Sequence, residues 1–306
     1  NIQVFKKTEF AETVFSAIEA YNEGRYDDAV KYYNQILEKN ASFVNAYIGL
    51  GKIAQRDENY ELASYYFKIA NYKIGYSDVF WEQRDNWLSK NLIWLLIVIV
   101  ALIVLTALKV PKKLYKLLPD KVHNFFDKIK NTKVCRELSY LFKMLRKPND
   151  AFYDIKFNLS IRARTAFFVL IAFILINIFG DFIVRGYLFR TSNLQNVNFS
   201  MELLKWGLII ILFVFSNFLI STLQNGEGFF RDIFIGTVFS FAPLILFKIP
   251  VDLLSNLLTY NESYLYTIIT AVLWIWSIFN VILMLKEIHN FQINFALKDH
   301  FPKNNS

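Results

Sequence analysis

Five stretches of the chain carry almost no charged side chains, and each has the length of a membrane-spanning helix. About 20 apolar residues in a helix cross the hydrocarbon core of a bilayer. The block at 233–249 is the weakest of the five, because Pro243 would leave a backbone carbonyl that neighbouring helices must satisfy. The pattern predicts an all-α protein with a multi-span helical membrane bundle, whose spans are residues 92–108, 166–184, 206–223, 233–249 and 264–285.

The segment before the first apolar block predicts a different kind of domain, a helical repeat. Residues 10–75 contain two copies of a unit spaced by 34 residues, so that Tyr26 aligns with Tyr60 and Ala29 with Ala63. The spacing and the residue types resemble the tetratricopeptide repeat, in which small residues let two helices approach and aromatic residues fill the groove beside them. About three units are normally needed for stability, so we expect a helix over residues 76–88 to cap the two copies.

This repeat has two possible roles that the sequence does not separate. It can be a helical spacer above the membrane, or its groove can bind a peptide or a protein partner. Repeats of this type bind many different partners, so the resemblance does not identify one. The positions expected to form the packing and the partner groove are Tyr26, Ala29, Tyr33, Tyr47, Gly51, Tyr60, Ala63 and Phe67.

Positive charge is concentrated in one segment between apolar blocks. The whole chain has 34 Lys and Arg against 26 Asp and Glu, a net charge of +8, whereas residues 109–165 alone hold 15 basic and 5 acidic residues. Basic residues close to spans stay in the cytoplasm. We therefore expect a multi-pass protein of the cell membrane with an extracytoplasmic N-terminal domain and a cytoplasmic C-terminal tail.

The same basic segment contains two candidate amphipathic helices. Leu114, Leu118, Val122, Phe125 and Ile129 form one apolar face among lysines, and residues 138–145 repeat the pattern. Such helices lie in the headgroup plane with lysine toward anionic membrane lipid. Nucleic-acid binding is the weaker alternative, because no base-reading motif accompanies the charge.

These observations give the expected domain organisation. Residues 1–90 are an extracytoplasmic repeat domain with its capping helix, and residues 91–109 are the first span. A basic cytoplasmic linker follows at 110–164, then a four-span membrane domain at 165–290 and a cytoplasmic tail at 291–306.

Composition narrows the possible chemistry. Hydrophobic residues make up 55% of the chain, against roughly 45–50% in ordinary soluble domains. One Cys excludes an internal disulfide, and 3 His make a multi-ligand zinc site improbable. No metalloprotease motif or phosphate-cradling glycine loop is present. We expect no catalytic residues, no metal and no cofactor, and an intramembrane enzyme assembled from distant residues is the alternative left open.

Read together, residues 141–295 resemble the Yip domain family of small multi-span membrane proteins, and especially its bacterial branch. The resemblance rests on the Ser-Asn, Ser-Thr-Leu and Gly-Glu-Gly features of residues 216–237, and on three further stretches. These are 147–156, 241–262 and the Trp274 to Trp276 pair with His289. The family has five spans, whereas four follow residue 141 here, so either a final span lies beyond this sequence or this member lacks it.

The order of repeat, span and Yip-like domain is similar to the C-terminal part of bacterial proteins that begin with an NHL-repeat propeller. Those proteins tend to be encoded beside sugar-type ABC transporters, so the resemblance implies ABC transporter subunits as partners. Residue 1 is Asn rather than Met, and an external domain needs an export signal, so we expect one upstream.

Ionisable residues inside membrane spans are functional candidates by default. Here they fall into pairs four residues apart, which lie on one helix face and can neutralise each other. The expected pairs are Asp181 with Arg185, Glu227 with Arg231, and Lys248 with Asp252. Asn177 and Asn217 are expected to hydrogen-bond between helices. The membrane-domain candidates are Asn177, Asp181, Arg185, Asn217, Glu227, Arg231, Pro243, Lys248, Asp252 and Glu262.

Two functions remain open at this stage. The favoured one is a non-enzymatic membrane scaffold, whose repeat binds a protein partner and whose bundle associates with membrane partners. The alternative is a transporter subunit that moves a small solute along a path lined by Asp181, Arg185, Lys248 and Asp252.

Overall fold

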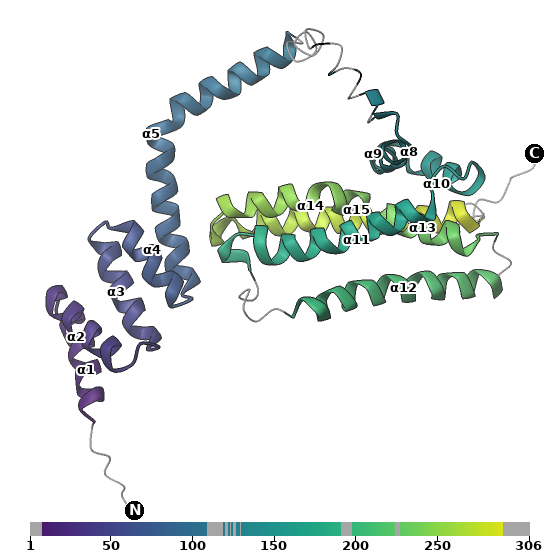
Figure 1. Ribbon diagram of the computed structural model, residues 1–306. Helices are drawn as coiled ribbons and strands as arrows, with labels where there is room; N and C mark the ends of the chain where they lie inside the picture. Colours follow the sequence, from purple (N-terminus) through teal and green to yellow (C-terminus); the bar gives the residue numbers. More distant parts are fainter. Residues whose placement is uncertain are drawn as a thin grey trace, which may run out of the picture. The chain divides into compact units, whose positions relative to one another are not determined.

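The computed structural model describes residues 8–108, 119, 122, 124, 127–128, 130–190, 198–223 and 227–289, and the regular structure of these residues is helical (Figure 1). The chain divides into two compact units. The first contains residues 1–116 with 259–262, and the second contains 117–258 with 263–306.

The N-terminal unit begins with two helix pairs. Helix α1 packs on α2, α3 packs on α4, and α2 also contacts α3. The aligned residues Tyr26 and Tyr60 each begin the second helix of a pair, so the predicted period of the sequence is the period of the structure. The four helices are α1 (Glu9–Asn22), α2 (Tyr26–Lys39), α3 (Val44–Arg56) and α4 (Tyr60–Ile69).

Small residues allow the close approach of these helices. Ala29 and Ala63 are fully buried. A Cβ atom on Gly51 would lie 2.5 Å from Cε1 of Phe67 on the neighbouring helix, so no larger residue fits there without displacing the ring. Phe67 is itself fully buried. The repeat positions Tyr26, Tyr47 and Tyr60 are partly exposed, and Tyr33 is buried.

The turn inside each pair uses a left-handed backbone conformation. Gly24 has a φ of 78° and the aligned Glu58 has a φ of 58°. A glycine adopts this conformation without steric cost, whereas an L side chain meets the following carbonyl oxygen at a cost of about 1–2 kcal/mol.

We expect Glu58→Gly to stabilise the N-terminal unit by about 0.5–1 kcal/mol, because the relief of backbone strain exceeds the extra entropy of the unfolded glycine. Gly24→Ala, at the aligned position, should have the opposite sign. Thermal unfolding of the full chain with the two variants measures both. A loss of stability for Glu58→Gly would mean that the glutamate side chain contributes more than its backbone costs.

Helix α5 (Lys73–Ala107) joins two predicted elements into one. The expected cap at 76–88 and the first span at 92–108 form a single helix of 35 residues, which Figure 1 shows bending partway along its length. Its N-terminal part packs against α4 and α3, with Val79 fully buried. No residue of its most apolar window is buried in the described structure, as expected for a helix that faces lipid or other membrane proteins.

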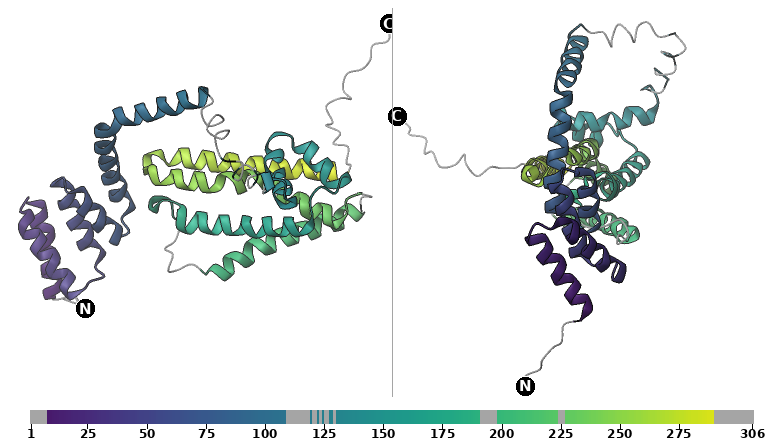
Figure 2. Two further views of the ribbon diagram at one scale, coloured as in Figure 1. Left: turned by 45° about the horizontal axis from the view of Figure 1, so that its top comes forward. Right: turned by 90° about the vertical axis from the view of Figure 1, so that its left-hand side faces the viewer.

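From residue 133 on, the described part of the second unit consists of three short helices followed by a helical bundle. Helices α11, α14 and α15 run side by side, α13 contacts α11 and α15, and α12 packs along α11 and α13 (Figure 2). Its helices are α8 (Lys133–Leu138), α9 (Tyr140–Arg146), α10 (Pro148–Phe157), α11 (Ala163–Phe179), α12 (Phe199–Leu223), α13 (Phe230–Ser240), α14 (Ala242–Leu254) and α15 (Ser263–His289).

All five predicted apolar blocks lie in helical segments long and apolar enough to cross a membrane. These segments of the described chain are Lys73–Ala107, Ala163–Val184, Phe199–Leu223, Phe230–Leu257 and Tyr260–His289.

The fourth segment, Phe230–Leu257, is not one continuous helix, and its two prolines occupy different positions in it. It is divided into α13 and α14 at Phe241, and Pro243 stands in the first turn of α14, where its missing N–H removes no hydrogen bond. Pro250 lies inside α14 and cannot donate to the carbonyl one turn earlier. Pro243 therefore marks the start of a helix. The backbone carbonyl that lacks a donor within the helix lies one turn before Pro250, and not at the position expected from Pro243.

The two amphipathic helices predicted in the basic segment have different outcomes. Most of the first lies outside the described residues. The second is interrupted at Ser139, which separates α8 from α9. The apolar residues Leu141 and Met144 of α9 are buried in the core of the bundle, where α9 contacts α13 and α14. The expectation that this face lies on lipid is wrong, because protein covers it.

A buried charge network in the bundle

Four of the predicted membrane-domain residues meet in one cluster, which we call the charge network. Asp181 lies in a single π-helical turn, Gly180–Val184, that follows α11, and Arg185 comes directly after this turn. Lys248 and Asp252 lie one turn apart in α14. The Asp252 side chain is fully buried and that of Lys248 is 4% exposed, whereas the side chain of Asp181 is 31% exposed.

Ion pairs connect the two helices as well as the two residues within each helix. The Lys248 ammonium lies 2.8 Å from Oδ1 of Asp181 and 2.7 Å from Oδ2 of Asp252. Arg185 forms an ion pair with Asp181, and its Nε lies 3.6 Å from Oδ1 of Asp252. Two acidic and two basic side chains therefore share one site with no net charge.

A third helix completes the network. Tyr266 of α15 donates its hydroxyl hydrogen to Oδ1 of Asp252 at 2.7 Å. The Arg185 guanidinium carbon lies 5.5 Å from the centre of the Tyr266 ring, within the range of a cation–π contact. A buried charge is tolerated when it is paired and hydrogen-bonded. The network therefore fastens α11, α14 and α15 together at one end of the bundle.

Gly180 makes room for the network. A Cβ atom at this position would lie 2.3 Å from Oδ2 of Asp252. Beside it, the N–H of Gly186 donates to Oγ of Ser255 at 2.8 Å, and the Asn256 side-chain amide donates to the carbonyl of Val184 at 2.7 Å. These bonds link the segment after α11 to the segment after α14, so the backbone around the charges is held on both sides.

Sequence reasoning found half of this arrangement. The two intrahelical pairs, Asp181 with Arg185 and Lys248 with Asp252, are present as predicted. Their connection to each other, and the participation of Tyr266 and Gly180, were missed. The opposite order of charge in the two pairs was an available signal, because two parallel helices place acid beside base when the order along the chain is reversed.

Other candidate residues do not join the network. Glu227 forms an ion pair with Lys156 at 2.8 Å rather than the expected pair with Arg231. Arg231 pairs with Asp232 at 2.8 Å and donates to the carbonyl of Ile161. The expected Glu227–Arg231 pair is wrong, because Glu227 precedes the first residue of α13 and the regular helical spacing does not hold there.

The two asparagine candidates behave differently. Asn217 of α12 contacts His289 of α15, with 3.1 Å between Oδ1 and Nε2, so it does connect two helices. Asn177 is buried, and its amide donates to the carbonyl of Phe173 one turn earlier in the same helix. Glu262 belongs to the N-terminal unit, where it forms an ion pair with Arg84 at 2.6 Å.

A separate polar contact connects α9 and α10, two of the short helices before the bundle. Asp154 of α10 forms an ion pair with Lys143 of α9, and it accepts hydrogen bonds from Tyr140 at 3.1 Å and Asn158 at 2.8 Å. The hydrogen bond from the Lys143 ammonium holds the pKa of Asp154 below its usual value, and the Asn158 and Tyr140 bonds act in the same direction against desolvation.

A carboxylate with a lowered pKa stabilises the folded state above the pKa of the unfolded chain, about 3.9, and this contribution is lost as the pH falls through the folded pKa. We therefore expect Asp154→Asn to lower the melting temperature at pH 6. The difference from the wild-type chain should shrink as the pH falls below about 4. Melting curves of both proteins across this range test the prediction. A difference that stays constant would show that the charge of Asp154 does not contribute.

Among the residues that the structure describes, no three His, Cys, Asp or Glu side chains come together as a metal site. The charges of the network are all paired with one another, so their arrangement supports the packing of the helices that carry them.

Comparisons with known proteins assign the bundle to a family. The model of the Yip1 domain matches residues 142–296, just over half of the 306-residue chain. No curated protein and no solved structure matches. The matched region runs from α9 past the end of α15, so it contains the whole charge network. With its apolar helices, the chain is a membrane protein, and it belongs to the Yip1 domain family, which is membrane-associated and non-enzymatic.

Proposed function

We propose that this protein is a non-enzymatic membrane scaffold, in which the bundle associates with other membrane proteins and the N-terminal repeat binds a protein partner. The observation that carries the proposal is the closed charge network. Asp252 is fully buried, and it is paired with Lys248 and hydrogen-bonded to Tyr266. Groups bound in this way hold helices in place.

A transport role makes a different demand on the same side chains. A path for a polar solute needs ionisable groups that face water and exchange partners. Lys248 and Asp252 are buried, which favours the structural role. The partly exposed Asp181 is the feature that keeps a transporter subunit as the second candidate.

Exposed apolar helix surface supplies contact area for membrane partners. Helix α12 buries only Ile210, Val214 and Ser221 among its 25 residues. The apolar window of α5 buries none of its residues. Such surface faces either lipid tails or the helices of another membrane protein. ABC transporter subunits are our proposed membrane partners, a suggestion taken from the sequence resemblance.

Affinity purification of the full chain from mild detergent tests the proposal. We expect membrane-protein partners to co-purify with the wild-type chain. They should also co-purify with a neutralised chain carrying Asp181→Asn, Arg185→Gln, Lys248→Met and Asp252→Asn, if it folds. Unchanged solute flux in cells with this variant supports the scaffold. Intact complexes with lost flux would instead favour the transporter subunit, and the absence of any co-purifying membrane protein would contradict both.

We further propose that the N-terminal unit is extracytoplasmic and that the segment after α5 is cytoplasmic, because of the concentration of basic residues in the latter. In a Cys135→Ser background, Asp57→Cys should react with an impermeant thiol reagent on intact cells. Asn131→Cys should react only after the membrane is opened. Both engineered sites are exposed, so accessibility within the protein does not limit the reaction. The reverse labelling pattern would overturn this orientation.

A further inference from the structure

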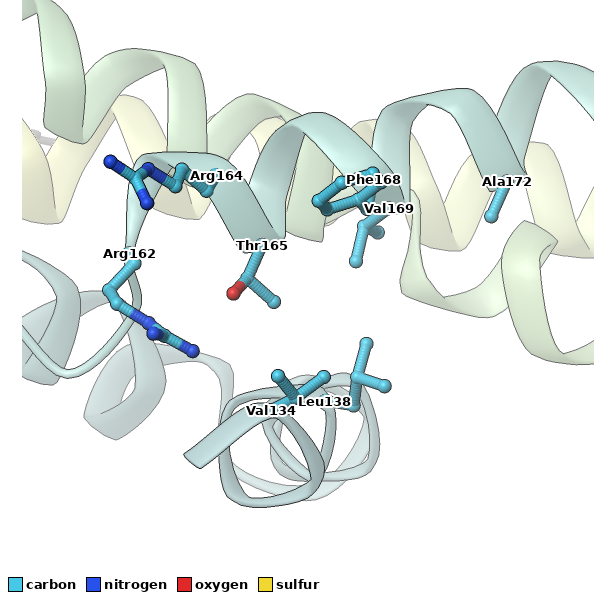
Figure 3. A pocket seen from close by; sticks show the side chains of 8 residues that line it. All are labelled: Val134, Leu138, Arg162, Arg164, Thr165, Phe168, Val169 and Ala172. Atoms are coloured by element: carbon cyan, nitrogen blue, oxygen red, sulfur yellow. The ribbon is translucent and has the colours of Figure 1, made fainter. Parts of the chain in front are cut away.

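An apolar cleft of about 500 Å³ lies between α8 and α11, away from the charge network (Figure 3). Val134 and Leu138 of α8 form one wall, and Phe168, Val169 and Ala172 of α11 form the other. The volume is within the range of small-molecule sites, about 300–1,000 Å³. The cleft is therefore large enough for a ligand, and its walls select an apolar one.

One end of the cleft carries positive charge. Arg162 and Arg164 lie at this end, while Ala172 lies at the other (Figure 3). Arg162 donates from Nε to the buried carboxylate of Glu137 at 2.6 Å, and Thr165 hydrogen-bonds the same carboxylate. Arg164 is exposed and forms no ion pair with any residue that the structure describes. These two arginines and Glu137 leave one net positive charge, on Arg164.

The polar and apolar ends are aligned with the membrane span. The apolar segment Ala163–Val184 begins beside the two arginines. The eight residue steps from Arg164 to Ala172 correspond to about 12 Å along a helix at 1.5 Å per residue. A ligand in the cleft would therefore have an anionic end at the membrane boundary and an apolar part beside the span.

We propose that this cleft binds an anionic glycerophospholipid, with its phosphate at Arg164 and one acyl chain between α8 and α11. A partner helix is a poorer occupant, because a helix about 10 Å wide fills roughly 1,000 Å³ over 12 Å of length, more than the cleft offers. The Arg164 charge favours a headgroup with a net negative charge over a zwitterionic or neutral one, because the phosphate of a zwitterionic lipid is already neutralised by its own cation. This site is independent of the scaffold function and does not need a protein partner.

Native mass spectrometry of the detergent-purified full chain tests the site. Phosphatidylglycerol and phosphatidylcholine with the same acyl chains are titrated in parallel. We expect tighter binding of phosphatidylglycerol than of phosphatidylcholine, because only the former has a net negative charge. Arg164→Ala should remove this preference and weaken phosphatidylglycerol binding roughly tenfold, the size expected for a hydrogen bond to a charged group. Ala172→Trp should weaken binding of both lipids, because it fills the apolar end.

Two matched variants control for charge and for bulk. Arg136→Ala removes an exposed arginine of α8 that does not line the cleft, and Ile171→Trp places the same tryptophan side chain on the outward side of α11. Both should bind like the wild-type chain. Equal binding of the two lipids to the wild-type chain, or unchanged binding in both Arg164→Ala and Ala172→Trp, would overturn the proposal. Unchanged melting temperatures in detergent show that the variants fold.

Discussion

Asp252→Ala is expected to destabilise the membrane bundle by about 3–5 kcal/mol, the cost of removing one partner from a buried ion pair. The aspartate is fully buried and contacts Lys248 and Tyr266. Its loss leaves the Lys248 ammonium, 4% exposed, with Asp181 as its remaining ion-pair partner. The apparent free energy of unfolding in detergent, followed by a denaturant titration of the full chain, measures the effect.

Two further variants identify the origin of that loss. Glu202→Ala removes an acid from the α12 pair with Lys205, where the Lys side chain is 55% exposed, and should cost less than about 1 kcal/mol. Lys248→Met combined with Asp252→Ala removes both charges and leaves Asp181 paired with Arg185, so it should recover most of the loss. A double variant no more stable than Asp252→Ala alone would contradict this recovery and would show that the unpaired Lys248 charge is not the origin of the loss.

The sequence was sufficient to predict the spans because the apolar runs are long and the charges at their borders are clear. It was less informative about helix ends. Helix α12 begins at Phe199, several residues before the apolar block at 206–223, and α5 continues from the polar N-terminal unit into the first apolar block. Hydropathy measures where the chain prefers lipid, whereas helices end where backbone hydrogen bonding stops, and the two points differ.

The site was predictable only as far as local spacing reaches. A spacing of four residues predicts the Asp181–Arg185 pair, because both side chains lie on one helix face. The contact between Lys248 and Asp181 depends on how α14 packs against α11, which no short spacing encodes. The same reason explains why α9 was assigned to lipid, since an apolar helix face does not reveal whether lipid or protein covers it.

Phe67→Ala is expected to cost the N-terminal unit about 3–5 kcal/mol, the range for removing a buried phenylalanine. The ring is fully buried and lies 5.5 Å from the Tyr72 ring, measured between centroids. Cβ atoms on Gly51 and Gly75 would each lie close to it, at 2.5 Å and 3.1 Å, so no larger side chain in α3 or α5 occupies that space. The variant therefore leaves a cavity where α3, α4 and α5 meet.

Hydrogen exchange of the full chain locates this loss as well as measuring it. Because the two compact units have separate cores, amides of α3 and α4 should exchange faster in Phe67→Ala while those of α14 and α15 stay protected. Tyr65→Ala, on the same helix but 59% exposed, should leave both patterns within about 0.5 kcal/mol of the wild-type chain. Faster exchange in α14 as well would show that the repeat stabilises the bundle, and that its role extends beyond presenting a surface to a partner.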